Sequence, residues 1–365
     1  GWMGVGTGFI ILSVYSVIAG WVMAYVVRMA SGELAGVDAA SAGAAFEGFT
    51  QDATSVLGWH TVFMILTMFI VARGVGRGIE VAVKYLMPAL FFLLSMLVFY
   101  SVVTTGPAFA EGLAFMFSFK FEELSWAALL LAMGQAFFTL SLGMGTMMAY
   151  GSYVPDDANL GSTVFTIAAL DTVIAIAAGL AIFPIVFANG LEVAQGPGLT
   201  FVTLPLAFGQ MPLGNVFGAL FFLLLTFAAI TSAISLTEPA LAFLVEEYNA
   251  KRQRVAISLG VICWALGLGT VFSFNIWSDF TFIGGLTFFD TVDYFSQNIL
   301  LPLGGMLITF FAVWLLPKGM LNSQLGIQST CISWVWRMVA GIIAPLGVLA
   351  VFSSTIWPLL SGLWQ

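Results

Sequence analysis

Residues 134–145 read GQAFFTLSLGMG and lie in the middle of a long apolar segment. Gly143 and Gly145 each lower helix propensity by about 1 kcal/mol, and Thr139 and Ser141 bring hydroxyl groups to the same region. A helix that only has to cross a membrane gains nothing from these residues at mid-depth. The stretch therefore predicts a helix that is interrupted near residues 139–145, with backbone carbonyls and hydroxyl oxygens free beside the break. The alternative is a small-residue face that packs against a neighbouring helix.

The composition of the whole chain is that of a membrane protein. Of 365 residues, 61% are hydrophobic and only 8% are charged, whereas about a quarter of the residues of a soluble domain carry charge. The apolar segments lack the polar alternation of barrel strands, so we expect an all-α integral membrane bundle that forms one transmembrane domain. Segments of about 20 mostly apolar residues predict nine spans. These are residues 8–29, 57–72, 84–104, 125–152, 161–188, 213–244, 255–275, 292–316 and 332–355.

The basic residues predict the orientation of these spans in a cell inner (plasma) membrane. Loops that carry Lys and Arg remain on the cytoplasmic side, and three alternate loops share these residues. They are Arg73, Arg77, Lys84, Lys251, Arg252, Arg254, Lys318 and Arg337. The loops on the other side are acidic, so the N-terminus is expected inside and the C-terminus outside. An odd number of spans requires the same arrangement.

The motifs of common enzyme classes are absent from the sequence. The chain has one histidine, His60, and neither an HExxH, a GxSxG nor a P-loop pattern in a suitable context. Its two cysteines, Cys263 and Cys331, lie in or beside apolar segments, so we infer neither a disulfide nor a metal site from them. We expect no enzyme activity and no nucleic-acid partner.

Three carboxylic acids lie within or beside the predicted spans, where ionisable residues are costly and suggest function. Asp171 has no basic residue within a helical turn, so a bound cation would be a natural counter-charge. Glu238 is interpreted as a carboxyl beside a kink at Pro239, in its protonated form. Asp293, at the start of the eighth span, is explained equally well by a place at the lipid interface.

Two further polar features stand out. Thr231 and Ser232, in FAAITSAIS, offer hydroxyl oxygens of the kind that hard cations prefer, although such hydroxyls also return hydrogen bonds to the preceding helical turn. Gly78 and Pro88 bracket the stretch GIEVAVKYLMP and could let this helix end unwind, or could mark an ordinary entry into a helix with a tolerated kink.

Together these segments resemble the neurotransmitter:sodium symporter family, and its bacterial amino-acid transporters in particular. The matching stretches, in family order, are VYSVIAGW (14–21), RGVGRGIEVAVKYLMP, GQAFFTLSLGMG, GSYVPDD, AITSAISLTEPALAFLVEE and FDTVDYF (289–295). The resemblance implies a LeuT-type inverted-repeat helical bundle, here with family helices three to eleven. The GLGN and RFP motifs of the family's first helix do not occur, so we expect that the first two helices are missing and that the chain is a fragment.

Position by position, the resemblance implies roles for individual residues. The substrate site would include Ile11, Tyr15, Phe138, Ser141, Met144, Ala233 and Leu236. Thr139 and Asp171 would bind a first sodium ion, and Ala228, Thr231 and Ser232 a second. Gln135 and Asp293 would belong to an extracellular gate, and Gly78 and Pro88 to a stretch that unwinds on the inner path. Because Asp171 supplies a fixed negative charge and Ala175 is not acidic, transport is expected to need no chloride.

The function that follows is sodium-coupled symport of a small neutral amino acid, hydrophobic or aromatic, by alternating access across the lipid bilayer. Two sodium ions would provide the coupling, with no organic cofactor. Two alternatives remain open: a nonfunctional remnant or packing subunit that needs a missing two-helix partner, and an amino-acid transporter coupled to protons. The sequence leaves the particular amino acid and the oligomeric state open.

Overall fold

The computed structural model describes residues 1–155, 158–193, 196–282, 285–327, 329–350 and 353. Within these ranges the chain forms helices and turns and no strand. The α-helices are α1 (Trp2–Ala30), α2 (Ala39–Gln51), α3 (Ala53–Ala72), α4 (Glu80–Thr104), α5 (Ala108–Phe117), α6 (Trp126–Thr139), α7 (Thr146–Gly151), α8 (Leu160–Ala188), α9 (Leu204–Gly209), α10 (Gly214–Tyr248), α11 (Arg252–Ser273), α12 (Phe288–Phe295), α13 (Leu301–Phe310), α14 (Lys318–Gln324) and α15 (Thr330–Met338). Short 3-10 or π-helical segments are η1 (Val75–Ile79), η2 (Phe121–Glu123), η3 (Leu199–Thr203), η5 (Ser296–Leu300), η6 (Phe311–Leu315) and η7 (Val339–Ile343).

Eight helical stretches in the described ranges are long and apolar enough to cross a membrane. They are Trp2–Ala30, Ala53–Ala72, Glu80–Thr104, Leu160–Ala188, Gly214–Tyr248, Arg252–Ser273, Phe288–Leu315 and Thr330–Ala350. The expected span 125–152 is not one of the eight, because its residues are divided between α6 and the six-residue α7. Residues 351–352 and 354–355, at the end of the last expected span, lie outside the described residues.

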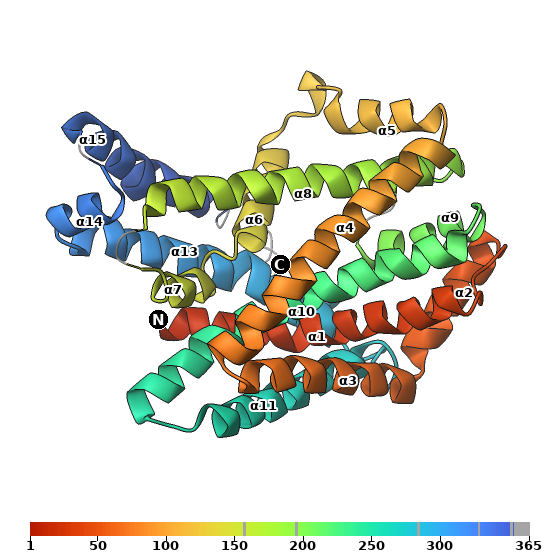
Figure 1. Ribbon diagram of the computed structural model, residues 1–365, viewed down its shortest axis with the longest axis horizontal. Helices are drawn as coiled ribbons and strands as arrows, with labels where there is room; N and C mark the ends of the chain where they lie inside the picture. Colours follow the sequence, from red (N-terminus) through yellow and green to blue (C-terminus); the bar gives the residue numbers. More distant parts are fainter. Residues whose placement is uncertain (156–157, 194–195, 283–284, 328, 351–352, 354–365) are drawn as a thin grey trace.

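Helix α1 occupies the centre of the bundle. It packs against α10, α3 and α11, and Figure 1 shows α10 crossing it at an angle while α3 and α11 lie along one side. Trp21 and Tyr25 on α1 are fully buried and contact the rings of Phe46, Phe201 and Phe222. Helix α8 lies against α4 and α5, on the other side of the bundle from α11. Among the eight candidate spans, the most buried is the one that carries Ile11 and Tyr15.

Polar residues before several helices explain where these helices begin. Asp38 accepts a hydrogen bond from the Ser41 N–H at 2.8 Å, and Asn159 accepts one from the Ser162 N–H at 3.1 Å. Thr287 forms a reciprocal capping box at the start of α12. Such caps satisfy N–H groups that have no partner inside the helix.

The turn after α1 carries an exposed ion pair. The Arg28 Nε atom lies 3.0 Å from Glu33 Oε1. This hydrogen bond holds the pKa of the Glu33 carboxyl below its ordinary value, and the charge of the guanidinium lowers it further. The pair links the end of α1 to the turn that leads to α2.

One glycine lets α1, α3 and α11 approach closely. A Cβ atom on Gly267 would lie 2.7 Å from the ring of His60 and 3.0 Å from the Ser13 carbonyl oxygen. His60 is fully buried, and its Nε2 atom lies 3.3 Å from the Trp264 carbonyl oxygen. The chain's one histidine therefore packs between three helices in the core.

Candidate functional site

The first feature of the site is a break in helical structure between α6 and α7. Helix α6 ends at Thr139 and α7 begins at Thr146, with Leu140 capping the end of α6. Ser141, Gly143 and Gly145 have φ angles of 54°, 82° and 79°. Glycine adopts this left-handed region at little cost, whereas a serine there is strained. Gly143 and Gly145 thus form a sharp turn after α6.

Gly143 also has no room for a side chain. A Cβ atom on Gly143 would collide with the Leu301 carbonyl oxygen and would lie 3.0 Å from the Gly305 N atom. Both contacts come from α13, so the turn after α6 is pressed against that helix. A glycine is required here by its φ angle and by the close approach of α13.

The turn lines a cavity of about 280 Å³ between α1, α6, α8 and α10. All of its lining residues belong to the sequence-predicted site. They are Ile11, Tyr15, Gln135, Phe138, Thr139, Ser141, Met144, Asp171, Ser232 and Leu236. The fold thus brings together side chains that lie up to 225 residues apart in the sequence, from Ile11 to Leu236.

The lining separates into apolar and oxygen-bearing groups. Ile11, Met144 and Leu236 are buried, and Phe138 is half-buried beside them. The oxygen donors are the carboxylate of Asp171, the hydroxyls of Thr139, Ser141, Ser232 and Tyr15, and the amide of Gln135. The Tyr15 hydroxyl and the Ser232 hydroxyl line the same cavity. Chemically, the arrangement can hold a small molecule that has an apolar side chain and a polar end.

Asp171 is the one charged side chain that lines this cavity. It is half-buried on α8, and Ala175, one turn further, is exposed. No lysine or arginine belongs to the lining. A carboxylate and hydroxyl oxygens without a basic partner form a set of hard donors that suits an alkali cation. Thr139, Gln135 and Ser232 are exposed, so the cavity reaches the surface of the described structure at these residues.

The three residues predicted for a second ion site lie together on α10. The Thr231 hydroxyl donates a hydrogen bond to the Ala228 carbonyl oxygen at 2.9 Å. This is the bond to the preceding helical turn that was the alternative to cation binding. Ser232 lines the 280 Å³ cavity, whereas Ala228 lines a neighbouring cavity of about 370 Å³ that also includes Tyr15.

The remaining predicted residues do not line the cavity. Ala233 is fully buried on α10, and Asp293 is half-buried on α12, where its Oδ1 atom accepts a hydrogen bond from Gln297 at 2.6 Å. Gly78 is buried in the π-helical segment η1, and α4 continues through Pro88 without a break. The stretch bracketed by these two residues is therefore helical in this structure, because the Pro88 ring is accommodated inside α4.

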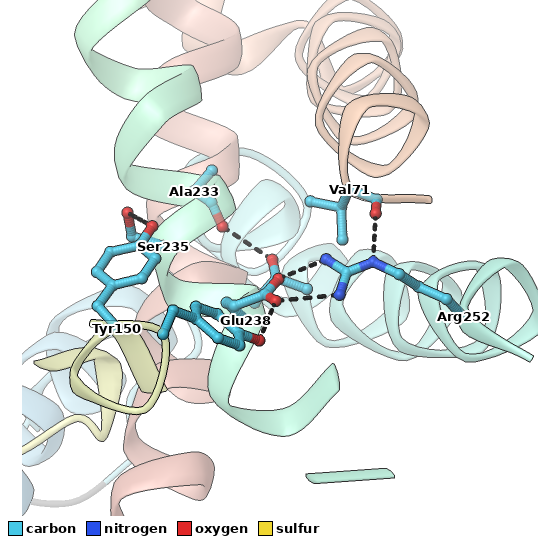
Figure 2. A network of polar contacts seen from close by, with 8 residues as sticks. Val71, Tyr150, Ala233, Ser235, Glu238 and Arg252 are labelled. Carbon is cyan, nitrogen blue, oxygen red and sulfur yellow. Dashed lines mark hydrogen bonds and ion pairs between the residues drawn. The ribbon is translucent and has the colours of Figure 1, made fainter. Parts of the chain in front are cut away.

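The structure also contains a polar network that the sequence interpretation missed (Figure 2). Glu238 is fully buried, and its carboxylate accepts hydrogen bonds from Arg252 at 3.0 and 2.7 Å and from the Tyr153 hydroxyl at 2.8 Å. Arg252 also donates from Nε to the Val71 carbonyl oxygen at 3.0 Å. Nearby, the Tyr150 and Ser235 hydroxyls lie 2.6 Å apart.

This network corrects the interpretation of Glu238 as a lone protonated carboxyl beside Pro239. It is one partner of an ion pair that joins α10 to α11. The sequence signal was a buried acid, which is costly unless it is paired, followed by the basic run at 251–254. In the sequence, this basic run predicts only the orientation of the spans.

Comparisons with known proteins agree with this geometry. Residues 46–361 match the model of the sodium:neurotransmitter symporter family. Over 98% of its length the chain is 37% identical to the uncharacterized sodium-dependent transporter YhdH of Bacillus subtilis (strain 168), of which it covers 79%. It is 30% identical to an uncharacterized sodium-dependent transporter of Haemophilus influenzae, with coverage of 98% of this chain and 79% of the relative.

A solved structure with the same fold is that of MhsT in complex with L-phenylalanine. It superposes with a TM-score of 0.88 at 43% sequence identity, over 97% of this chain and 80% of MhsT. The family match spans most of the chain, and the similar proteins match it over nearly its whole length. The chain therefore belongs to the sodium:neurotransmitter symporter family, whose members are multi-pass membrane transporters coupled to sodium and not enzymes.

Proposed function

We propose that this chain carries the translocation site of a symporter that couples sodium to the uptake of a neutral amino acid with a hydrophobic or aromatic side chain. The observation that supports the proposal is the 280 Å³ cavity, whose lining includes four apolar side chains together with Tyr15 and Ser141. Small-molecule sites in proteins occupy about 300–1,000 Å³, so a cavity just below this range suits a ligand as small as a single amino acid. MhsT, with which the chain shares its fold, was solved with L-phenylalanine bound.

In this proposal the apolar side chains of Ile11, Phe138, Met144 and Leu236 contact the substrate side chain, with Ala233 behind them. The Tyr15 hydroxyl donates a hydrogen bond to the substrate carboxylate, and Ser141 contacts its polar end. Met144 adapts to side chains of different shape because it is flexible and polarizable.

Two sodium ions travel with the substrate. Thr139 and Asp171 provide oxygen ligands for the first, and the Ala228 carbonyl with the Thr231 and Ser232 hydroxyls for the second. The Thr231 hydroxyl already donates to Ala228, so its lone pairs remain free to face a cation. Because Asp171 supplies the negative charge itself, transport needs no chloride.

The remaining assignments complete the transport cycle. Asp293 and Gln135 belong to an outer gate, and the stretch between Gly78 and Pro88 unwinds when the inner path opens. Helix α6, the turn 140–145 and α7 together form one interrupted span, which makes nine spans in a LeuT-type inverted repeat. Each ligand drives alternating access only to the extent that it binds one state better than the other. The N-terminus of the chain faces the cytoplasm.

Uptake by proteoliposomes tests the proposal. The full chain is reconstituted, and uptake of labelled phenylalanine and leucine is followed with an inward sodium gradient, with chloride replaced by gluconate. We expect uptake that depends on sodium and is unchanged by gluconate. Asp171→Asn should weaken the sodium dependence at least tenfold, since it removes the fixed charge, and Asp279→Asn, an exposed acid outside the cavity, should not.

Uptake that ignores sodium, or that persists unchanged in Asp171→Asn, would contradict the coupling scheme. Uptake driven by a pH gradient without sodium would favour the proton-coupled alternative. A chain that folds but transports nothing, and that recovers transport when a two-helix partner is supplied, would favour the packing-subunit alternative.

A further inference from the structure

Helices α3 and α11 leave an apolar groove of about 440 Å³ between them, away from the substrate cavity. Met68 and Gly260 form its floor, where a Cβ atom on Gly260 would lie 2.6 Å from the Met68 side chain. Its walls are Ile65, Phe69, Ile257 and Val261, which are exposed by 65%, 54%, 62% and 58%. In a protein that spans a membrane, such a groove suits a hydrocarbon chain, but its apolar walls alone do not identify the occupant.

The charges at one end of the groove indicate the chemistry of its occupant. The Arg252 Nε atom donates to the Val71 carbonyl oxygen at 3.0 Å, so the end of α3 and the start of α11 lie at the same end of the groove. Arg73 caps α3, and its guanidinium lies 4.2 Å above the ring of Phe69, a groove wall. Lys251 and Arg254 flank the start of α11.

Three of these cations are free to bind a ligand. The charge of Arg252 is already matched by Glu238. Arg73, Lys251 and Arg254 are exposed, and no carboxylate of the described ranges lies within ion-pair distance of them. The N-terminus of α11 points toward the same end and adds the positive end of the helix dipole. The apolar groove thus opens, where α3 ends and α11 begins, on a cluster of positive charge that has no carboxylate partner in the described ranges.

We propose that this groove binds one anionic phospholipid of the surrounding leaflet. An acyl chain lies between Ile65 and Val261, and the headgroup phosphate is held by the guanidinium groups of Arg73 and Arg254, with Lys251 beside them. Guanidinium groups pair with phosphate through two parallel N–H donors, and each basic residue near a membrane surface favours anionic lipid. A zwitterionic lipid fits the groove equally well but lacks the net charge that matches the cluster.

Native mass spectrometry of the full chain tests the proposal. The detergent-purified protein is titrated with dioleoyl phosphatidylglycerol and with dioleoyl phosphatidylcholine, which have the same acyl chains. We expect one phosphatidylglycerol to bind about tenfold more tightly than phosphatidylcholine. The double variant Arg73→Gln/Arg254→Gln should lose this preference, whereas Lys84→Gln, an exposed lysine on α4 outside the groove, should keep it.

A second variant tests the apolar half of the site. Val261→Trp, which fills the groove from an exposed wall position, should weaken both lipids by a similar factor of about five or more, since a buried acyl chain contributes through its methylene groups. If the double variant is too unstable to purify, Arg73→Gln alone should lower the preference about threefold.

Four outcomes would overturn the proposal. One is equal affinity for the two lipids, and another is a preference that survives the double variant. The third is efficient cross-linking between copies of Ile65→Cys chains in phosphatidylglycerol vesicles, because the groove would then be covered by a second copy. Competition by soluble glycerol phosphate at millimolar concentration would place the binding in the headgroup alone and would also overturn it.

Discussion

Replacing Arg252 by methionine should destabilise the protein strongly, because the replacement leaves Glu238 buried without its counter-charge. The side chain of Glu238 is 0% exposed and that of Arg252 is 19% exposed. Removing one partner of a buried ion pair costs about 3–5 kcal/mol, mainly because the remaining charge cannot return to water. The Val71 carbonyl oxygen and the Tyr153 hydroxyl stay near the vacated space, and neither can replace the guanidinium charge.

The double variant Glu238→Leu/Arg252→Met should recover most of this loss. Replacing both partners by apolar side chains of similar size is often neutral, so we expect a net cost of no more than about 2 kcal/mol. With the single variant Glu238→Leu measured as well, the double-mutant cycle should give a coupling energy of at least about 1 kcal/mol. Arg73→Met is the matched control, because this exposed arginine stacks on Phe69 without a carboxylate partner, and its loss should cost less than about 1 kcal/mol.

Thermal unfolding in detergent, followed by a thiol-reactive dye, measures these effects. Cys263 is fully buried and reacts only on unfolding, whereas the exposed Cys331 is first replaced by serine. For 365 residues at about 2.1 cal/mol/K each, a loss of 3–5 kcal/mol lowers Tm by about 4–6 °C. A Tm for Arg252→Met within 1 °C of the parent, or a double variant less stable than the single one, would refute the reasoning.

Three further predictions concern two glycines and one surface acid. Gly143→Ala should abolish uptake and lower Tm by several degrees, because the φ angle of Gly143 is 82° and the Leu301 carbonyl oxygen occupies the place of the new methyl group. The control Gly134→Ala, whose new methyl group meets nothing within 4 Å, should transport normally. Gly267→Ala should lower Tm through its clash with the ring of His60, and a Tm equal to that of the parent would show that the three helices separate without cost. The pKa of Glu33 is lowered in the folded protein, so its small contribution, a few tenths of a kcal/mol at this exposed site, is present above its unfolded pKa and is lost as pH falls through the lower folded value. Glu33→Gln should therefore lower the stability by a few tenths of a kcal/mol at pH 7 and match the parent at pH values well below about 4.5, which denaturation at a series of pH values will show.

The sequence by itself determined the class of the protein. The near absence of charge and the length of the apolar segments require a helical membrane bundle, because only helices satisfy the backbone in lipid when no barrel pattern is present. Gly143 and Gly145 marked the interruption after α6, since left-handed backbone favours glycine whatever surrounds it. The lining of the 280 Å³ cavity came from the resemblance to a known family, which already contains the tertiary arrangement.

Only the tertiary structure decided which distant side chains meet. Glu238 and Arg252 are 14 residues apart and pair because α10 and α11 turn back on one another, and no helical periodicity encodes that turn. In the same way, His60 packs against Gly267, and Arg252 at the start of α11 reaches the Val71 carbonyl oxygen at the end of α3, because the helices cross at particular depths. Backbone preferences and the free energy of transfer to lipid depend on single residues and short segments, so both can be predicted from the local sequence. Pairing between helices depends on their relative rotation and offset, which the packing of the whole bundle sets.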